Sequence, residues 1–423
     1  MPAVNAGVMA ADQGNARAQN NLGVCYYNGE GVTQNKAEAA RLFKLAADQG
    51  YARAQYNLGV CYEYGEGVAK DIKEAVRLYK LAADQGNAKA QCNLGVCYEY
   101  GKGVTQNKTE AARLYKLAAD QGNANAQCCL GVCYEYGKGV TQNKTEAARL
   151  YKLAADQGYA RAQYNLGVCY EYGEGVAKDI KEAVRLYKLA ADQGNAKAQC
   201  NLGVCYEYGK GVAKDMKEAV RLYKLAADQG DARAQCNLGW CYEYGEGVAK
   251  DIKEAVRLYK LAADQGYARA QCCLGVCYEY GKGVAKDIKE AVRLYKLAAD
   301  QGYAQAQCNL GVCYDNGEGV AQNKTEAARL YKLAADQGNA RAQCCLGVCY
   351  EYGEGVAKDI KEAVRLYKLA ADQGYATAQC CLGVCYYNGE GVTQNKTEAA
   401  RLFRLAAAQG DEDAKKALKG LGY

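Results

Sequence analysis

The segment Asn87–Gly122 reads NAKAQCNLGVCYEYGKGVTQNKTEAARLYKLAADQG, and it returns with substitutions along almost the whole chain. The leucine of its Leu-Gly step marks each copy, and successive marker leucines are 36 residues apart. The eleven marker leucines are Leu22, Leu58, Leu94, Leu130, Leu166, Leu202, Leu238, Leu274, Leu310, Leu346 and Leu382. A fixed period of this length is typical of a solenoid, in which each unit packs mainly on its neighbours.

Each copy predicts two helices joined by a glycine-rich turn, as residues 51–86 illustrate. The first helix is expected at about Ala52–Tyr64, where apolar side chains recur at helical spacing. The second helix begins at a capping box formed by Asp71 and Glu74, and it ends at Gly86. Its predicted buried stripe consists of Ile72, Ala75, Val76, Tyr79, Ala82 and Ala83. The sequence therefore predicts an all-α chain of eleven helix-turn-helix repeats without β-strands.

Two local features refine this prediction. Gly59 lies beside the apolar stripe of the first helix, so it removes a side chain where the second helix must approach closely. Some copies begin the second helix with asparagine, as at Asn107, where Asn-Lys-Thr also fits a glycosylation sequon. We interpret these asparagines as helix caps, because they occupy the N-cap position and no secretion signal is recognisable.

The composition argues against catalysis. The 423 residues include no histidine and no serine, so neither a Ser–His nor a Cys–His pair can form, and imidazole metal ligands do not exist. An enzyme also needs one asymmetric site, yet residues 51–86 and 159–194 are identical. We therefore predict a non-enzymatic protein without cofactor or metal. The net charge of +6 is small and evenly spread, which does not favour binding to nucleic acid or insertion into a membrane.

The 23 cysteines occupy three positions of the first helix and none of the second. Every copy has one cysteine three residues after the marker leucine, and most have another two residues before it. Four copies have a third cysteine directly before the leucine: Cys129, Cys273, Cys345 and Cys381. No disulfide can therefore link the two helices of one unit. We expect reduced and mostly buried thiols in a cytoplasmic protein. Several bridges between adjacent units, found in protein purified with its thiols trapped, would contradict that location.

The ends of the chain differ from its middle. We predict a partial repeat at residues 1–14, eleven repeats over 15–410, and a capping helix with a polar surface at 411–423. The first residues lack the pattern of a signal peptide, and no apolar run approaches the roughly 18 residues that span a bilayer. We expect a cytoplasmic location, with secretion as the alternative.

The repeated motif is A-x-A-Q-x-x-L-G-x-x-Y-x-x-G-x-G-V, followed by K-x-A-x-x-x-x-x-x-A-A-x-x-G. In the copy of Leu58 its residues are Ala52, Ala54, Gln55, Leu58, Gly59, Tyr62, Gly65, Gly67, Val68, Lys73, Ala75, Ala82, Ala83 and Gly86. Over residues 15–410 the chain resembles the Sel-1-like repeat family, a relative of the tetratricopeptide repeat. The resemblance implies a right-handed α/α superhelical solenoid that acts as a scaffold or adaptor. One secreted, cysteine-rich branch of the family joins its two helices by disulfides, and this chain departs from that branch.

Most residues that differ between copies lie on one face of the first helix. On a helical wheel, the positions five and two before the marker leucine and two, five and six after it lie away from the core stripe. In the related tetratricopeptide solenoids this face lines the concave side. Because arginine, tyrosine and tryptophan are common interface anchors, we interpret the face as a partner-binding surface; the alternative is neutral variation on a solvated face. The predicted partner-binding residues are Arg53, Tyr56, Arg161, Tyr164, Arg233, Trp240, Arg269 and Arg341.

Trp240 is the most specific of these predictions. It is the only tryptophan, and it replaces the valine that follows the marker leucine by two residues in the other ten copies. We expect its ring to lie near Arg233 and Arg269 and to anchor a bound chain. The alternative is a packing role against neighbouring first helices.

The leading functional hypothesis is a non-enzymatic scaffold or adaptor that binds a protein or an extended peptide along this face. Two alternatives stay open at this point. One is an architectural segment of a larger secreted or membrane-tethered repeat protein, and the other is a thiol-rich, redox-responsive protein. Slow reaction of the thiols under native conditions would favour the scaffold over the redox-responsive protein.

Overall fold

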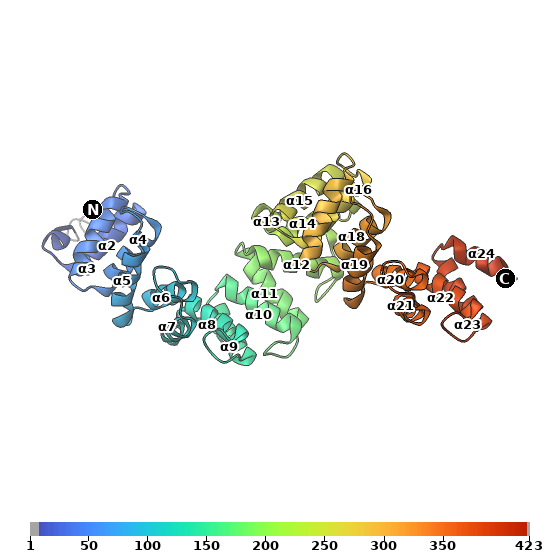
Figure 1. Ribbon diagram of the computed structural model, residues 1–423. Coiled ribbons are helices and arrows are strands. Elements are labelled where there is room, and N and C mark those ends of the chain that lie inside the picture. Colours follow the sequence, from blue (N-terminus) through green and yellow to red (C-terminus); the bar gives the residue numbers. More distant parts are fainter. Residues whose placement is uncertain (1–7, 421–423) are drawn as a thin grey trace. The chain divides into compact units, whose positions relative to one another are not determined.

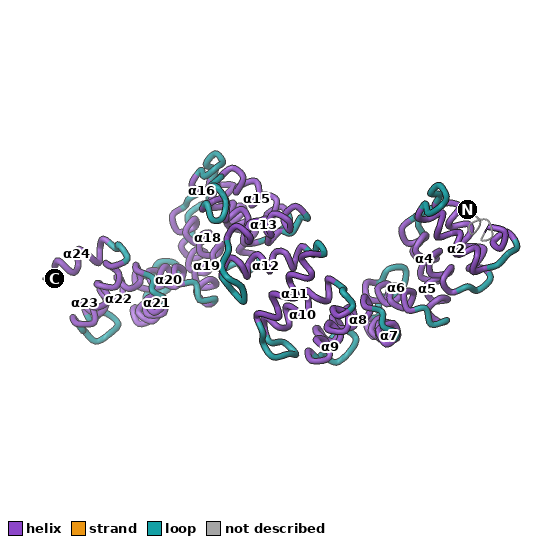
Figure 2. The backbone as a smooth tube through the Cα atoms, turned by 180° about the vertical axis from the view of Figure 1, so that it is seen from behind, coloured by secondary structure: helices purple, strands orange, loops and turns teal. Residues whose placement is uncertain are grey.

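The structure is a computed structural model, and it describes residues 8–420 of the chain (Figure 1). In this described part, the regular elements are helices, and Figure 2 shows only helices and loops there. Helix pairs follow one another at the expected spacing, so the predicted all-α repeat architecture is confirmed. Residues 1–7 of the predicted partial repeat and 421–423 of the predicted capping helix lie outside the described residues.

Each repeat contributes a first and a second helix of 13 residues. The first helices are α2 (Ala16–Asn28), α4 (Ala52–Tyr64), α6 (Ala88–Tyr100), α8 (Ala124–Tyr136), α10 (Ala160–Tyr172), α12 (Ala196–Tyr208), α14 (Ala232–Tyr244), α16 (Ala268–Tyr280), α18 (Ala304–Asn316), α20 (Ala340–Tyr352) and α22 (Ala376–Asn388). The second helices are α3 (Lys36–Asp48), α5 (Ile72–Asp84), α7 (Lys108–Asp120), α9 (Lys144–Asp156), α11 (Ile180–Asp192), α13 (Met216–Asp228), α15 (Ile252–Asp264), α17 (Ile288–Asp300), α19 (Lys324–Asp336), α21 (Ile360–Asp372) and α23 (Lys396–Ala408). A shorter helix, α24 (Glu412–Gly420), follows the last repeat.

The chain divides into two compact units, Met1–Lys214 and Asp215–Tyr423. Within each unit, a first helix packs on the second helix of its own repeat, and that second helix packs on the first helix of the next repeat. The hydrophobic core of each unit is therefore continuous from repeat to repeat, as in other repeat proteins.

Side-chain caps and glycines set the ends of the helices. The Asp71 side chain accepts a hydrogen bond of 3.0 Å from the Glu74 backbone N–H at the start of α5. Asn107 caps α7 in the same way, with 3.0 Å to the Glu110 N–H, so its interpretation as a cap is confirmed. Gly65 ends α4 with a φ of +75°, a left-handed conformation that side chains rarely adopt.

Within each unit, a buried aromatic ring joins the two helices of a repeat. In α5 the Tyr79 side chain is fully buried, and its ring lies against Gly59 of α4. A Cβ atom added at Gly59 would lie 2.7 Å from that ring, which confirms the predicted reason for the glycine. The predicted core stripe of α5 omitted Leu78, which is also buried. Leu78 packs into the core of the preceding repeat, because a second helix lies between two neighbours and is covered on both sides.

Candidate binding face

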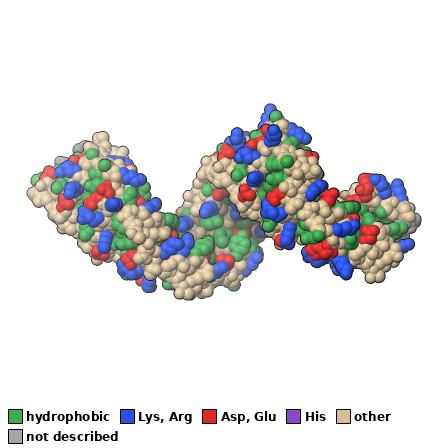
Figure 3. Space-filling model, in the orientation of Figure 1, with side chains coloured by type: hydrophobic (Ala, Val, Ile, Leu, Met, Phe, Trp, Pro, Cys, Tyr) green, Lys and Arg blue, Asp and Glu red, His purple; other side chains and the backbone are tan. Residues whose placement is uncertain are grey.

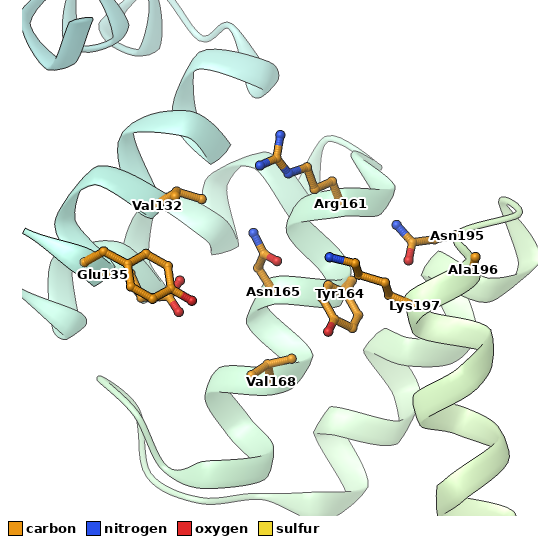
Figure 4. A pocket seen from close by; sticks show the side chains of 10 residues that line it. Val132, Glu135, Arg161, Tyr164, Asn165, Val168, Asn195, Ala196 and Lys197 are labelled. Carbon is orange, nitrogen blue, oxygen red and sulfur yellow. The ribbon is translucent and has the colours of Figure 1, made fainter. Parts of the chain in front are cut away.

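The first helices α8, α10 and α12 surround a pocket of about 500 Å³ in the N-terminal unit (Figure 4). Its lining residues are Val132, Glu135, Tyr136, Arg161, Tyr164, Asn165, Val168, Asn195, Ala196 and Lys197. Most of them occupy the helix positions that the sequence analysis placed away from the core stripe. The pocket exists because three neighbouring first helices present these positions to one hollow.

A second pocket, of about 300 Å³, lies on the same face in the C-terminal unit, between α16, α18 and α20. Its lining residues are Val276, Glu279, Tyr280, Gln305, Asn309, Val312 and Arg341. Each of them has a counterpart at the same repeat position in the first pocket. For example, Gln305 stands where the first pocket has Arg161, and Arg341 stands where it has Lys197.

The first pocket combines both signs of charge. The Glu135 carboxylate accepts a hydrogen bond from the Tyr151 hydroxyl of α9, which holds it at the pocket wall. A hydrogen bond to Glu135, together with burial, raises the pKa of Tyr136 to about 12, so this hydroxyl stays protonated near neutral pH. The cationic side chains of Arg161 and Lys197 line the same pocket from α10 and α12 (Figure 4). The pocket therefore offers a carboxylate, two cations and the phenols of Tyr136 and Tyr164 to one ligand.

The structure brings only some of the predicted residues together. Arg161 and Tyr164 line the first pocket, and Arg341 lines the second. In the described part of the chain, the other five predicted residues line neither of these two pockets: Arg53, Tyr56, Arg233, Trp240 and Arg269. Of these five, Arg53 and Arg233 are exposed, and the other three are half-buried.

The predicted tyrosines are partly committed to packing within their own repeat. The Tyr56 ring lies 6.0 Å from the ring of the buried Tyr79, measured between centroids, and the planes are tilted by 34°. Tyr164 makes the same contact with Tyr187, also at 6.0 Å. Each ring therefore has one side in the protein and is only half-buried, so part of it faces the binding surface.

Trp240 is half-buried, and its ring lies against Tyr244, one turn further along α14, with 5.3 Å between the centroids. Glu243 on the same helix is buried, with 9% of its surface exposed. Arg269 donates a hydrogen bond of 3.1 Å to the Asn237 side chain of the preceding first helix, so its guanidinium is held across two repeats. An anchoring role for Trp240 stays a prediction.

The sequence-based prediction missed five residues of the first pocket that have polar side chains: Glu135, Tyr136, Asn165, Asn195 and Lys197. The prediction selected arginines and aromatic residues at positions that vary between copies. The positions five and six residues after the marker leucine are a glutamate and a tyrosine in most copies, so they were not selected. The helical wheel placed these two positions on the predicted binding face. A search for polar residues that stay the same in most copies would therefore have found them. Lys197 stands at the same repeat position as Arg161, on the predicted face, but only arginines were selected as binding residues at that position.

Two further pockets lie in the C-terminal unit: one of about 280 Å³ next to Tyr244 and Lys282, and one of about 410 Å³ between α21, α22 and α23. On the side shown in Figure 3, basic and acidic side chains are interspersed. Among residues 8–420 there is no group of three or more cysteine, aspartate or glutamate side chains arranged to hold a metal ion. Within the same residues, no helix has both the length and the apolar character needed to cross a bilayer.

Comparison with known proteins gives the family. The Sel1 repeat model matches eleven consecutive segments: 16–51, 52–87, 88–123, 124–159, 160–195, 196–231, 232–267, 268–303, 304–339, 340–375 and 376–411. The chain is similar to the crystal structure of c5321, a protective antigen of uropathogenic Escherichia coli strains with an SLR fold. It is 35% identical to that protein, the match covers 98% of this chain and 89% of that one, and the TM-score is 0.76.

A second similar structure is a Sel1 repeat protein from Oxalobacter formigenes. It is 32% identical, the match covers 73% of this chain and 89% of that one, and the TM-score is 0.50. No curated protein matches the chain. With eleven matched repeats and a similar structure over nearly its full length, the chain belongs to the Sel1 repeat family.

Proposed function

We propose that this chain is a non-enzymatic scaffold or adaptor that binds an extended segment of another protein along the face of its first helices. The observation that carries the proposal is the pair of pockets, one in each unit, built from equivalent positions of three successive first helices. A ligand that crosses several helices meets the same positions again at each repeat, which suits an extended chain.

The chemistry of the first pocket also suits a polypeptide. Arg161 and Lys197 match acidic side chains, whereas Glu135 and Tyr136 match basic side chains or backbone N–H groups. The Asn165 side chain adds an amide that is able to hydrogen-bond with a peptide backbone. Tyrosine and arginine contribute strongly at protein interfaces, because they combine a large contact area with hydrogen bonding.

A peptide-display selection on the full chain tests the proposal. We expect the enriched peptides to bind at least tenfold more weakly to the double variant Arg161→Ala/Lys197→Ala, measured by titration calorimetry. The matched control is Arg185→Ala, which removes an arginine paired with Glu182 on the second helix α11. Binding that is unchanged by the double variant, or that depends on Arg185, would contradict a site on the first-helix face.

The alternative of an architectural segment of a secreted or membrane-tethered protein is favoured by one comparison. The similar Escherichia coli protein is a protective antigen. We propose a cytoplasmic location as the main case, and fractionation of cells that express the native gene distinguishes the two. Recovery of the chain outside the cytoplasm would support the alternative.

A further inference from the structure

Adjacent first helices contact each other through two fixed positions. The residue two before the marker leucine of one repeat faces the residue directly before the marker leucine of the next repeat. Three hydrogen bonds report this contact in different repeats: Asn57 to Asn20 at 2.9 Å, Asn165 to the Cys128 sulfur at 3.6 Å, and Asn309 to the Cys272 sulfur at 3.7 Å. The partners are 37 residues apart in each case, so the contact is a property of the repeat and not of one pair.

In four places within the two units, both of these positions are cysteine. The pairs are Cys92 with Cys129, Cys236 with Cys273, Cys308 with Cys345, and Cys344 with Cys381. Every cysteine that directly precedes a marker leucine thus faces a cysteine of the preceding repeat. The four residues that precede the leucine had no explanation in the sequence analysis, and this contact supplies one.

The two thiols of a pair differ in access and acidity. Cys236 is fully buried, whereas Cys273 is half-buried. A hydrogen bond between the thiols lowers the pKa of Cys273, and the nearby Arg269 guanidinium acts in the same direction. The same hydrogen bond and burial raise the pKa of Cys236. Cys273 is therefore the thiol that ionises first and that a reagent meets first.

The other pairs repeat the asymmetry in pKa, and Cys345 and Cys381 are half-buried like Cys273, whereas Cys129 is buried. The pKa is lowered for Cys129, Cys345 and Cys381, in each case by the hydrogen bond with the thiol of the preceding repeat. Arg341, one turn before Cys345 on α20, takes the place that Arg269 has beside Cys273.

We propose that these four thiol pairs are redox-modification sites, each of which takes one disulfide that links two adjacent repeats. The oxidant is a small-molecule disulfide. The accessible thiolate attacks one of its sulfurs, forms a mixed disulfide and releases the first small thiol. The buried thiol of the preceding repeat then attacks the protein sulfur of the mixed disulfide and releases the second small thiol. Two protein thiols are oxidised, one small disulfide is reduced to two thiols, and the two protons leave with them.

Two other cysteines at this contact have an asparagine, not a cysteine, opposite them. Cys128 and Cys272 face the asparagines Asn165 and Asn309 across the same contact. Cys133 lies four residues after Cys129 on one helix, and that spacing does not allow disulfide geometry without distortion of the backbone. The proposal therefore predicts which cysteines are oxidised and which are not.

The test uses the full chain, fully reduced and then treated with oxidised glutathione under native conditions. We expect four bridges, located by differential thiol labelling and tandem mass spectrometry, with a loss of two hydrogens for each. Cys128 and Cys272 should stay reduced. The variant Cys273→Ser should lose the bridge to Cys236 and keep the other three, with an unchanged circular dichroism spectrum.

Asn309→Cys supplies a constructive control, because it places a thiol opposite Cys272 and should create a fifth bridge at the same contact. Four pairs that stay reduced while other cysteines form bridges would overturn the proposal. Bridges that form only after unfolding, or a silent Asn309→Cys variant, would overturn it as well. These readouts do not depend on a partner, so the proposal stands or falls independently of the binding function.

Discussion

The first repeat and the fourth repeat fill the space between their helices in two different ways. In the fourth repeat, the buried Tyr151 of α9 donates a hydrogen bond to Glu135 of α8. In the first repeat, Phe43 takes the place of the buried tyrosine and Tyr27 takes the place of the glutamate. Their ring centroids are 6.4 Å apart. The last repeat has the same exchange, with Phe403.

In both repeats an aromatic ring of the second helix fills the core. The hydroxyl group lies on the second helix in the fourth repeat and on the first helix in the first repeat. In the first repeat, the Tyr27 hydroxyl donates to Glu66 of the next repeat, and Lys36 forms an ion pair with the same carboxylate. A buried hydroxyl needs a partner, so the tyrosine and the glutamate have to change together. The comparison shows that the two positions act as one unit.

The largest expected effect is alkaline unfolding of the repeats that contain the buried tyrosine. Burial, together with the hydrogen bond to a carboxylate, raises the pKa of Tyr79, Tyr151 and Tyr187 far above that of an exposed tyrosine. A raised folded-state pKa gives stability that is complete below the unfolded value, at about pH 10, and that is lost as the pH rises further. We expect a late step in tyrosinate absorbance to coincide with loss of helical circular dichroism. Ionisation of all tyrosines before any helix is lost would contradict this.

Removal of the ring should separate inner from terminal repeats. Tyr151→Ala leaves a cavity in the middle of a unit, and we expect a loss of about 3–5 kcal/mol in the free energy of unfolding. Phe43→Ala creates a similar cavity in the first repeat, where fraying can stay local. Hydrogen exchange measured by mass spectrometry should show lost protection on both sides of Tyr151, but only near α2 and α3 for Phe43→Ala. Equal effects on the main unfolding transition would mean that position in the array does not matter.

A smaller effect is expected when only the hydroxyl is removed. Tyr151→Phe leaves the Glu135 carboxylate without its donor and should cost about 1.5–3 kcal/mol by chemical denaturation. The double variant Tyr151→Phe/Glu135→Tyr copies the first repeat and should recover most of this loss. The introduced tyrosine has an acceptor in Glu174, which pairs with Lys144 at 2.9 Å as Glu66 pairs with Lys36 in the first repeat.

The third repeat provides the matched control for this exchange. Tyr115→Phe/Glu99→Tyr makes the same change, but the next repeat has Lys138 where Glu174 stands in the other case. A tyrosine hydroxyl gains no carboxylate there, so recovery should be clearly weaker. Full recovery in both repeats would show that ring packing alone, without the acceptor, decides the exchange.

The smallest effect is expected in the ninth repeat. There Asp315 replaces the glutamate, and the Tyr331 hydroxyl is 3.5 Å from it, compared with 2.5 Å between Tyr79 and Glu63. Asp315→Glu should shorten this contact and raise the free energy of unfolding by about 0.5–1.5 kcal/mol. Asp336→Glu, at an exposed site on α19, is the control and should have little effect. A stabilisation that is equal in both variants would point to a general effect of glutamate.

The sequence predicted the parts of the fold that depend on neighbours along the chain. The bounds Ala52–Tyr64, the Asp71 cap and the close approach at Gly59 all follow from local pattern, and the structure confirms them. Burial of Leu78 was missed because it depends on the preceding repeat.

The candidate site was harder to predict for the same reason. Helical periodicity placed Arg161 and Tyr164 on one face, but the pocket needs α8, α10 and α12 together. The distances between those helices depend on packing between repeats. A helical wheel describes a single helix and gives no information on these distances. The facing thiols of Cys92 and Cys129 escaped notice for this reason also.

The uniform contact between first helices has a genetic consequence. Because residues 51–86 and 159–194 are identical, unequal recombination between their coding segments would remove or add whole repeats in frame. Loss of residues 51–158, for example, would bring Asn20 opposite Asn165, the same residue type as the Asn57 that it contacts now. Array length is thus free to change between generations by whole 36-residue repeats, and recombination between identical copies keeps the residue types at the new joint.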